Sequence, residues 1–455
     1  MFGRDIIIEL RHWAEKGHRK PLVLRGARQV GKTSVVNEFG REFENYLYIN
    51  LEIRELHDLF TNVADVKELL IDLFVIKGQV QREGRTLLFI DEIQNSPQAV
   101  ALLRYFYEEL PHIHVVAAGS LLESLIDTHI SFPVGRVEYM AMHPCSFREF
   151  LSASGEDLLR RRIENNPLKS VGFHEKLIQL FNRYALIGGM PEIVAQYIER
   201  KDIVALNDTF DSLLFGYRDD VEKYARNRTQ TEVIRHILTA GWTEAASTIT
   251  LGRFAGSEYR AREMGEAFAT LEKAMLLELA YPVTQTELPL LPERQRAPKL
   301  LWLDSGLVNY AAGIQKEVFS AKDVLDAWRG RLAEHLVAQE LLTLNHRFGQ
   351  QRNFWVRQKI GASAEVDFVW QYESRLVPIE VKSGNNAHLR SLHSFIDHSQ
   401  NCNLAVRIWS QPYSVNEVTT PSGRTFTLLN VPFYLVGILP LLVEQNGERY
   451  HQLSK

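Results

Sequence analysis

The residues best suited to chemistry in the first part of the chain form the run GARQVGKT at positions 26–33. Its two glycines permit a tight turn in which successive backbone N–H groups point at a phosphate, and the N-terminus of a following helix adds positive potential. Lys32 is then placed to reach the β- and γ-phosphates of a nucleotide, and the Thr33 hydroxyl to ligate Mg²⁺. The run therefore predicts a site for ATP and Mg²⁺, with the nucleotide bound by Gly26, Ala27, Arg28, Gln29, Val30, Gly31, Lys32, Thr33 and Ser34.

An apolar run that ends in two carboxylates supplies the second part of this chemistry. Residues 87–90 are all apolar and are followed by Asp91 and Glu92. A buried strand brings its last residues to the carboxyl edge of a parallel sheet, where such sheets bind ligands. We expect Asp91 to hold Mg²⁺ and Glu92 to polarise the water that attacks the γ-phosphate.

The next apolar run ends at Ser120, for which two interpretations are open. Ser120 either hydrogen-bonds the attacking water or a phosphate oxygen, or simply caps the helix that follows. The first interpretation requires the strand at 114–119 to lie between the strand before the phosphate loop and the strand that ends at Asp91.

The elements that must position these residues alternate along the first 150 residues. This alternation is typical of an α/β fold with a parallel sheet covered by helices on both faces. We expect helices at 32–39, 66–76 and 98–110, and strands at 21–25, 46–51, 86–91, 114–119 and 137–142.

Several runs of sequence resemble one bacterial and archaeal family of AAA+ ATPases that carries a poorly characterised C-terminal domain. The runs are GARQVGKT at 26–33, DEIQ at 91–94, AAGS at 117–120 and VGRVEYMAMHPCSFREF at 134–150, with GG-x-P-E matched by Gly188, Gly189, Pro191 and Glu192. The resemblance implies that Ser120 stands at the sensor-1 position. It also implies that Arg136 is an arginine finger or phosphate sensor, because a guanidinium can spread its charge over transition-state oxygens. A solvated or structural Arg136 is the alternative, and a finger acting in trans would require a homo-oligomer.

The middle of the chain is expected to hold two helical regions. Residues 151–225 look like the AAA+ helical lid with connecting helices. Residues 226–315 read as a winged helix, with helical stretches at 233–240, 253–254 and 261–277 and a hairpin of strands at 279–283 and 299–304. The helix at 261–277 mixes acidic and basic side chains, so contacts with DNA and with a protein partner both stay open.

Acidic residues recur in a second constellation near the C-terminus. Glu334 lies on an amphipathic helix, Asp367 on a predicted strand, and Glu380 and Lys382 two residues apart on the next. Residues i and i+2 of a strand point the same way, so Glu380 and Lys382 share a face that Asp367 can meet. Catalysis by Asp367, Glu380 and Lys382, with Mg²⁺ held by Glu334, Asp367 and Glu380, is the predicted chemistry.

This pattern resembles the PD-(D/E)xK restriction-endonuclease-like fold, which we expect over residues 320–455. Solvated charges on an edge strand are the alternative interpretation. The final stretch at 427–442 reads as strand-like and is expected to pack beside this domain.

Composition limits the remaining possibilities. The chain has 455 residues, a net charge of -4 and a pI near 6.5, which argues against a uniformly basic nucleic-acid-binding protein. There is no run of 18 apolar residues, so no membrane span is expected, and Cys145 and Cys402 are too few for a disulfide framework. A cytoplasmic protein is the expectation.

The sequence thus predicts a P-loop AAA+ parallel-sheet domain at 1–150, a helical lid, a winged helix and a C-terminal restriction-endonuclease-like α/β domain. Its predicted function is ATP hydrolysis that drives a conformational change coupled to action on DNA. The alternative is a nucleotide-dependent regulatory or interaction protein whose endonuclease-like domain is not catalytic. A small-molecule kinase fits less well, because Glu92 and Ser120 suit hydrolysis.

Overall fold

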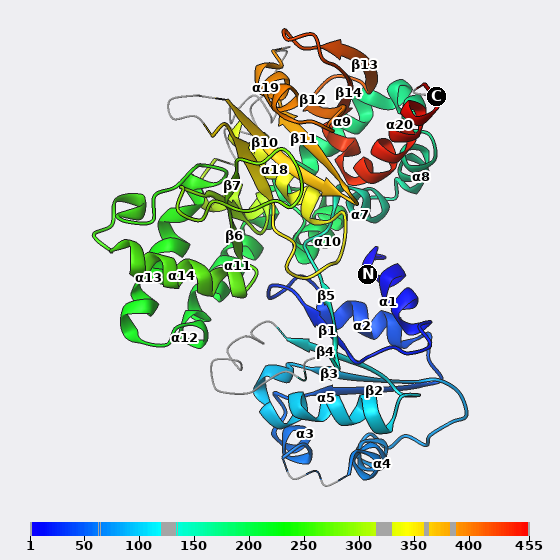
Figure 1. The fold of residues 1–455 in the computed structure, drawn as a ribbon. Coiled ribbons are helices and arrows are strands. Elements are labelled where there is room, and N and C mark those ends of the chain that lie inside the picture. The colour runs from blue at the N-terminus through cyan, green and yellow to red at the C-terminus, as the bar shows by residue number, and fades with distance from the viewer. Residues whose placement is uncertain are drawn as a thin grey trace.

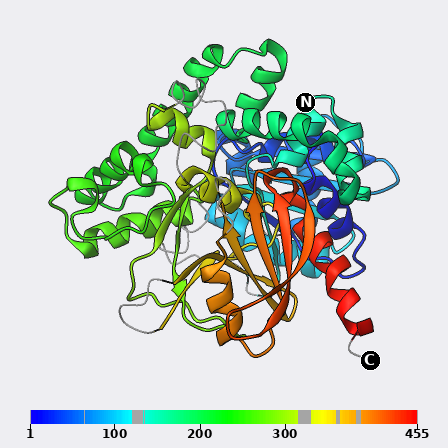
Figure 2. The same cartoon turned by 90° about the horizontal axis from the view of Figure 1, so that it is seen from above.

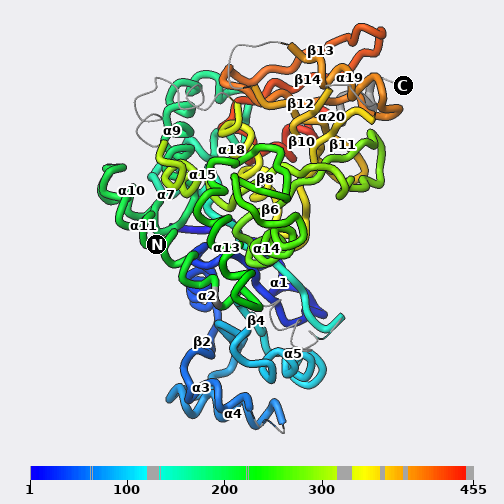
Figure 3. Tube along the Cα trace, turned by 90° about the vertical axis from the view of Figure 1, so that its left-hand side faces the viewer, coloured from blue at the N-terminus to red at the C-terminus, as the bar shows by residue number. Residues whose placement is uncertain are grey.

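The computed structural model describes residues 2–61, 63, 65–119, 133, 135–314, 330–358, 364–382 and 388–453. Figure 1 shows the first sheet and its helices at one end of the molecule and the C-terminal strands at the other. Figure 3, seen from the side, shows the same separation. Among the described residues, no helix is both long and apolar enough to span a bilayer.

The first sheet has five strands, all parallel, in the order β2-β3-β4-β1-β5. This order confirms that the strand at 114–119 lies between the strand before the phosphate loop and the strand that ends at Asp91. Each strand lies within two residues of its predicted bounds. The strands are β1 (Leu22–Arg25), β2 (Asn45–Asn50), β3 (Thr86–Asp91), β4 (His114–Gly119) and β5 (Glu138–Ala141).

Helices cover both faces of this sheet, as the sequence predicts. Neighbouring strand residues point to opposite faces, so Leu24 packs with α1 (Ile6–Ala14) and α2 (Lys32–Gly40), whereas Val23 packs on the other side. That second side is covered by α3 (Arg54–Leu59), α4 (Val66–Ile76) and α5 (Pro97–Glu109).

The next part of the chain is helical. A capping box starts it: the Ser146 side chain accepts from the Glu149 N–H, and the Glu149 carboxylate accepts from the Ser146 N–H. The helices are α7 (Phe147–Ala153), α8 (Asp157–Asn165), α9 (His174–Ile187), α10 (Pro191–Arg200), α11 (Asn207–Asp219) and α12 (Val221–Tyr224), with short 3-10 segments η2 (Pro167–Phe173) and η3 (Val204–Leu206).

The region predicted as a winged helix differs from expectation in two places. The helix predicted to reach 277 ends at Lys273, because Met275 adopts a left-handed conformation with φ 59°. The strand predicted at 279–283 is divided: β6 pairs with β8 in an antiparallel hairpin, whereas β7 pairs with a strand of the C-terminal sheet. The elements are α13 (Arg228–Ala240), η4 (Gly241–Glu244), η5 (Phe254–Gly256), α14 (Ala261–Lys273), β6 (Leu277–Ala280), β7 (Pro282–Val283), β8 (Lys299–Trp302) and α15 (Ser305–Ala311).

A second, mixed sheet forms the C-terminal part, in the order β13-β14-β12-β11-β10-β9-β7. Figures 1 and 2 place α13 and α14 on one side of this sheet and α20 on the other. The expectation that 427–442 is strand-like is wrong beyond Pro432, where the chain turns into η6 and then α20. The elements are α18 (Arg331–Leu342), β9 (Asn353–Val356), β10 (Glu365–Tyr372), β11 (Arg375–Val381), α19 (Arg390–His398), β12 (Leu404–Trp409), β13 (Ser414–Thr419), β14 (Thr425–Pro432), η6 (Phe433–Ile438) and α20 (Leu439–Leu453).

Candidate active site

The phosphate loop connects β1 to α2, and its backbone depends on its glycines. Gly31 has φ 93°, in the left-handed region that favours glycine, and a Cβ on Gly26 would lie 2.5 Å from the carbonyl oxygen of Met142. Lys32 is the first residue of α2, so the helix N-terminus opens toward the loop. This is the local geometry that a polyphosphate requires.

Lys32 lies buried within the loop. Its Nζ donates to the carbonyl oxygens of Gly26 and Ala27, each at 2.9 Å. Burial lowers the pKa of Lys32 to about 8, an effect that the nearby Glu92 and Asp91 carboxylates oppose. A bound phosphate would offer this ammonium a stronger, charged acceptor than the two carbonyls do.

Thr33 and Asp91 meet at the end of β3. The Thr33 Oγ1 donates to Asp91 Oδ2 at 2.8 Å, and the Tyr48 hydroxyl donates to the same oxygen at 3.3 Å. Asp91 is only 3% exposed, and burial raises the pKa of its carboxyl group. A hydroxyl and a carboxylate oxygen in contact fit a hard cation such as Mg²⁺, so the residues suit the predicted metal.

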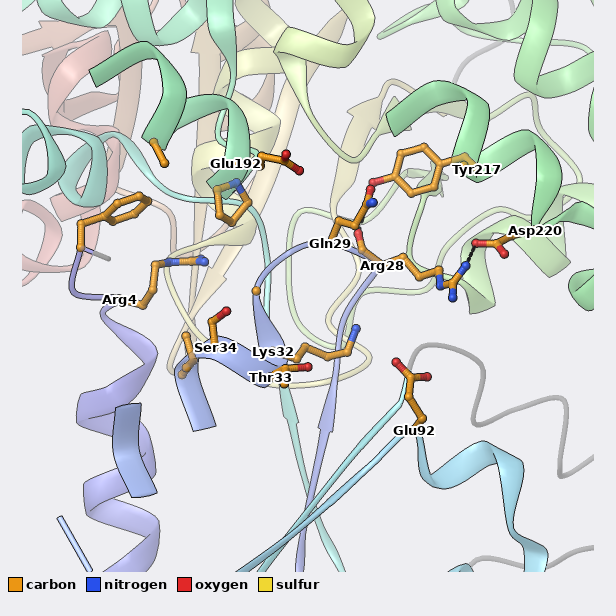
Figure 4. A pocket seen from close by; sticks show the side chains of 16 residues that line it. Arg4, Arg28, Gln29, Lys32, Thr33, Ser34, Glu92, Glu192, Tyr217 and Asp220 are labelled. Carbon is orange, nitrogen blue, oxygen red and sulfur yellow. Dashed lines mark hydrogen bonds and ion pairs between the residues drawn. The ribbon is translucent and has the colours of Figure 1, made fainter. Parts of the chain in front are cut away.

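Glu92 follows in a left-handed conformation with φ 52°. Its carboxylate accepts a hydrogen bond from the side-chain amide of Gln94, which orients it. Figure 4 shows the Glu92 and Lys32 side chains reaching toward the same space at the mouth of the loop. A residue held in this strained region deserves a functional explanation, and the position suits a general base.

Lys32, Thr33 and Glu92 line a cavity of about 780 Å³, whose size is that of a small-molecule site. Its other walls come from residues that the sequence did not single out as nucleotide-binding. Asp220 forms an ion pair with Arg28 of the phosphate loop, and the Tyr217 hydroxyl donates to the Arg28 carbonyl at 3.2 Å. Phe2, Arg4, Pro191, Glu192, Ala195 and Gly216 also line the cavity.

Arg4 supports the loop from the opposite side to α11. Its guanidinium donates to the carbonyl oxygens of Val30 at 3.0 Å and His143 at 2.7 Å, and to Glu149 Oε1 at 2.9 Å. The Glu149 partner lies in the 134–150 run, but no local pattern pairs it with a residue near the N-terminus. Sequence reasoning therefore missed Arg4.

Two further ATPase residues are predicted from sequence, Ser120 and Arg136. Ser120 lies outside the described residues. Arg136 precedes β5, whose Glu138 pairs with Leu22 at the start of β1, so Arg136 lies at the edge of the sheet opposite the phosphate loop. It forms an ion pair with Glu108 of α5 at 2.9 Å. A phosphate-sensor role for Arg136 in the pocket of its own chain is therefore not supported, and a role across subunits stays a prediction.

The C-terminal acidic residues lie near one another on α18, β10 and β11. Lys382 Nζ donates to Glu380 Oε1 at 2.6 Å, which agrees with the predicted shared face, and the backbone N–H of Val381 donates to Asp367 Oδ2 at 2.7 Å. Burial raises the pKa of Glu334 and of Glu380 to about 7, and repulsion from Asp367 adds to both shifts. We refer to Glu334, Glu365, Asp367 and Glu380 as the carboxylate cluster.

Lys299 of β8 also reaches this cluster. Its Nζ lies 3.0 Å from Glu334 Oε2, 2.7 Å from Glu365 Oε1 and 3.9 Å from Asp367 Oδ1. Among the described residues, no group of three or more histidine, cysteine or acidic side chains is arranged to hold a metal ion. The predicted ligands are thus close together, but in this conformation a lysine lies among them.

Comparisons with known proteins agree with the first sheet and loop. A family model described as an AAA domain matches residues 18–151. Two models of domains of unknown function match later segments: DUF8612 at residues 178–318 and DUF4143 at residues 329–434. No curated protein matches.

The chain is also similar to solved structures, among them three from archaea and bacteria. The Walker-type ATPase PABY2304 of Pyrococcus abyssi is 16% identical with a TM-score of 0.42, over 69% of this chain and 96% of that one. The ORC1 protein of Aeropyrum pernix, solved in complex with DNA, is 14% identical with a TM-score of 0.27, over 69% and 93%. RuvB of Thermotoga maritima is 16% identical with a TM-score of 0.26, over 61% and 90%.

The family match over residues 18–151 coincides with the five-stranded parallel sheet and with the loop that carries Lys32. Residues 18–151 match an AAA domain, and two domains of unknown function follow it along the chain.

Proposed function

We propose that the protein binds ATP with Mg²⁺ in the cavity at the phosphate loop and hydrolyses it to drive a conformational change. The observation that carries this proposal is the contact between Thr33 and Asp91, with Lys32 and Glu92 directed into the same cavity. Those four side chains are the groups that phosphoryl transfer to water needs: a phosphate clamp, two oxygen ligands and a base.

Each side chain has a distinct role in this proposal. Backbone N–H groups of residues 26–34 and the Lys32 ammonium hold the phosphates, and Thr33 and Asp91 hold the metal. Mg²⁺, when bound, would neutralise charge on the phosphate oxygens. Glu92 accepts the proton of the attacking water, and the Gln94 amide keeps its carboxylate oriented.

Two contacts would pass a change at the nucleotide to the helical region. The ion pair between Arg28 and Asp220 and the hydrogen bond from Tyr217 tie the phosphate loop to the end of α11. Phosphates bound at the loop would compete with the Asp220 carboxylate for the Arg28 guanidinium. The helices α10 and α11 would therefore act as the lid that responds to nucleotide.

In this proposal the movement of α10 and α11 is passed on to the C-terminal domain. That domain is endonuclease-like and acts on DNA. The proximity of Asp367, Glu380 and Lys382 to Glu334 supports this. The alternative is a regulatory protein whose endonuclease-like domain is not catalytic, and the Lys299 contacts favour it for the conformation described. A protein partner bound through α13, α14 and the β6–β8 hairpin would fit either function.

The ATPase proposal is tested with two substitutions and a control. Lys32→Ala should weaken binding of a fluorescent ATP analogue by about 10-fold to 100-fold, since it removes charge-assisted hydrogen bonds. Glu92→Gln should bind ATP normally but release phosphate about 10²-fold to 10⁴-fold more slowly. Lys67→Ala, on the exposed side of α4, is the matched control. Normal turnover by Glu92→Gln would show that Glu92 is not the base.

The proposal for DNA is tested separately. Purified protein is incubated with supercoiled, branched and single-stranded DNA and Mg²⁺ or Mn²⁺, with and without ATP. Cleavage that is lost in Asp367→Ala and Lys382→Ala, but kept in Arg375→Ala at the exposed start of β11, would support nuclease activity. Absence of cleavage under every condition would favour the regulatory function. Mass photometry with and without ATP tests whether Arg136 can act in a homo-oligomer.

A further inference from the structure

Lys299 is a buried lysine that belongs to one part of the chain and is neutralised by another. It is the first residue of β8, in the hairpin that follows α14, and it is 4% exposed. Its ammonium does not pair with a residue of its own hairpin in the contacts described. It pairs instead with Glu334 of α18 and Glu365 of β10.

The ammonium carries its charge in this environment. Burial disfavours the charged form, but the charges of Glu334, Asp367 and Glu365 outweigh burial and raise the pKa of Lys299. The ring of Phe354 lies 4.9 Å from Nζ, which adds a cation–π contact. Lys299 is thus a permanent cation placed between carboxylates.

The carboxylate cluster also contains an oxygen that lacks a partner. Glu380 is 6% exposed, and its Oε2 atom accepts no hydrogen bond among the described residues. A buried, unpartnered carboxylate oxygen is costly and is commonly explained by an ion that binds there. The two oxygens of Glu380 therefore differ. Oε1 accepts a hydrogen bond from Lys382, whereas Oε2 is available to a cation.

We propose that Lys299 is a built-in counter-ion that closes the carboxylate cluster to divalent cations, and that withdrawal of β8 is what opens it. This inference rests on the proposed endonuclease-like domain. Mg²⁺ and Mn²⁺ need several oxygen ligands around one point, and the ammonium already contacts the Glu334 oxygen that the cation would need. The Lys299 ammonium and a divalent cation bound to the same carboxylates would also repel each other.

The position of β8 explains how the cluster could respond to the rest of the protein. Two residues beyond β8, the Asp304 carboxylate accepts a hydrogen bond from the backbone N–H of Gly189 at 2.5 Å. Gly189 lies between α9 and α10, and α10 borders the nucleotide cavity. A shift of α10 on nucleotide binding would therefore pull on the strand that carries Lys299.

The test measures Mn²⁺ binding to the full chain without nucleotide, by the electron paramagnetic resonance signal of free Mn²⁺. The variants are Lys299→Met, and the double variant Lys299→Met/Glu365→Gln, which removes one negative charge along with the positive one and so protects folding. Asp367→Asn, added to each background and to the unsubstituted protein, assigns the bound ion to the cluster. Lys273→Met, an exposed lysine at the end of α14, is the control.

We expect the double variant to bind one Mn²⁺ at least 10-fold more tightly than the unsubstituted protein, and to lose that ion when Asp367→Asn is added. Lys273→Met should match the unsubstituted protein. If the unsubstituted protein already binds an Asp367-dependent ion as tightly, Lys299 does not close the cluster, while the endonuclease-like proposal survives. If no background shows Asp367-dependent binding, Lys299 replaces no cation, and the metal-dependent nuclease proposal fails with it. The ATPase assignments are unaffected by either result, because they are read from Lys32→Ala and Glu92→Gln.

Discussion

Glu340 offers the sharpest quantitative prediction, because it is a carboxyl group buried where three parts of the chain meet. It lies on α18, is 1% exposed, and its Oε1 accepts from the Phe147 N–H at 2.9 Å and from the Tyr184 hydroxyl at 2.7 Å. Burial raises the pKa of Glu340 from its usual value of 4.5 to about 7, and the hydrogen bonds with Tyr184 and Phe147 only partly oppose it.

The direction of the pH effect follows from this rise. The folded protein holds the Glu340 proton more tightly than the unfolded chain, so the proton stabilises the fold at low pH. This contribution is lost as the pH rises from about 4.5 to about 7. A shift of that size corresponds to about 3 kcal/mol in the free energy of unfolding.

The substitution Glu340→Gln removes this titration while keeping the shape of the side chain and an oxygen for Phe147 and Tyr184. We expect the free energy of unfolding of the variant, relative to the unsubstituted protein, to increase by about 3 kcal/mol between pH 4.5 and pH 8. Asp304, whose pKa burial raises to about 6, titrates in both proteins and cancels in this comparison. Urea denaturation followed by circular dichroism at a series of pH values measures the difference.

Glu266→Gln on α14 is the control for the substitution itself. A stability difference for Glu340→Gln that stays constant across this pH range would refute the reasoning, because it would mean that the folded protein binds the Glu340 proton no more tightly than the unfolded chain does. A difference that decreases with pH would show that the ionised carboxylate is worth more to Phe147 and Tyr184 than its burial costs.

Two further predictions concern the nucleotide cavity and the junction beside it. Asp220→Asn should tighten ATP binding by a few-fold to about 10-fold in an equilibrium titration, because it removes a carboxylate that competes with phosphate for Arg28. Weaker binding would contradict this, because it would mean that the ion pair holds the phosphate loop in the conformation that binds ATP. Gly189→Ala should destabilise the protein by about 3 kcal/mol or more in urea, because its Cβ would lie 2.1 Å from the Cys145 carbonyl oxygen. Gly265→Ala inside α14, where the nearest atom is 3.9 Å away, should stabilise by about 0.5–1 kcal/mol and is the matched comparison.

The geometry of the candidate nucleotide site was largely predictable because its signals are local. The strand β3 has the predicted bounds, since six successive residues are buried and the run ends in Asp91. The loop geometry follows from Gly26 and Gly31. The contact of Thr33 with Asp91 follows once the loop after β1 and the end of β3 lie at the same carboxyl edge of the sheet.

Local signals failed where the backbone changes course without glycine. The predicted helix at 261–277 continues in apolar residues that suit a helix or a strand equally, and the break comes from the left-handed Met275. After β14 the chain stays apolar, but Pro432 ends the strand and the following residues are buried as helix rather than sheet. A periodic pattern cannot separate these cases, because such runs are apolar throughout and most of their residues are buried.

Contacts between distant segments could not be predicted from the sequence, for a different reason. Arg4 and Asp220 meet the phosphate loop only because α1 and α11 pack beside it, and no spacing in the sequence encodes those distances. Lys299 is the clearest case, since its neighbours in sequence suggest one strand of a hairpin and nothing about its carboxylate partners.

The paired glycines at 188 and 189 show both a local sequence signal and a contact between distant segments. Their sequence reads as the end of a helix, and Gly188 does follow α9 with φ 75°. However, a Cβ on Gly188 would also lie 2.1 Å from Asp304 Oδ1, so the glycines are required by close packing as well as by the turn. The same carboxylate is anchored to Gly189, and β8 runs back from it to Lys299. A single short strand therefore has one end against the helices that border the nucleotide and the other among the acids of the C-terminal domain, which is the arrangement that coupling between the two sites requires.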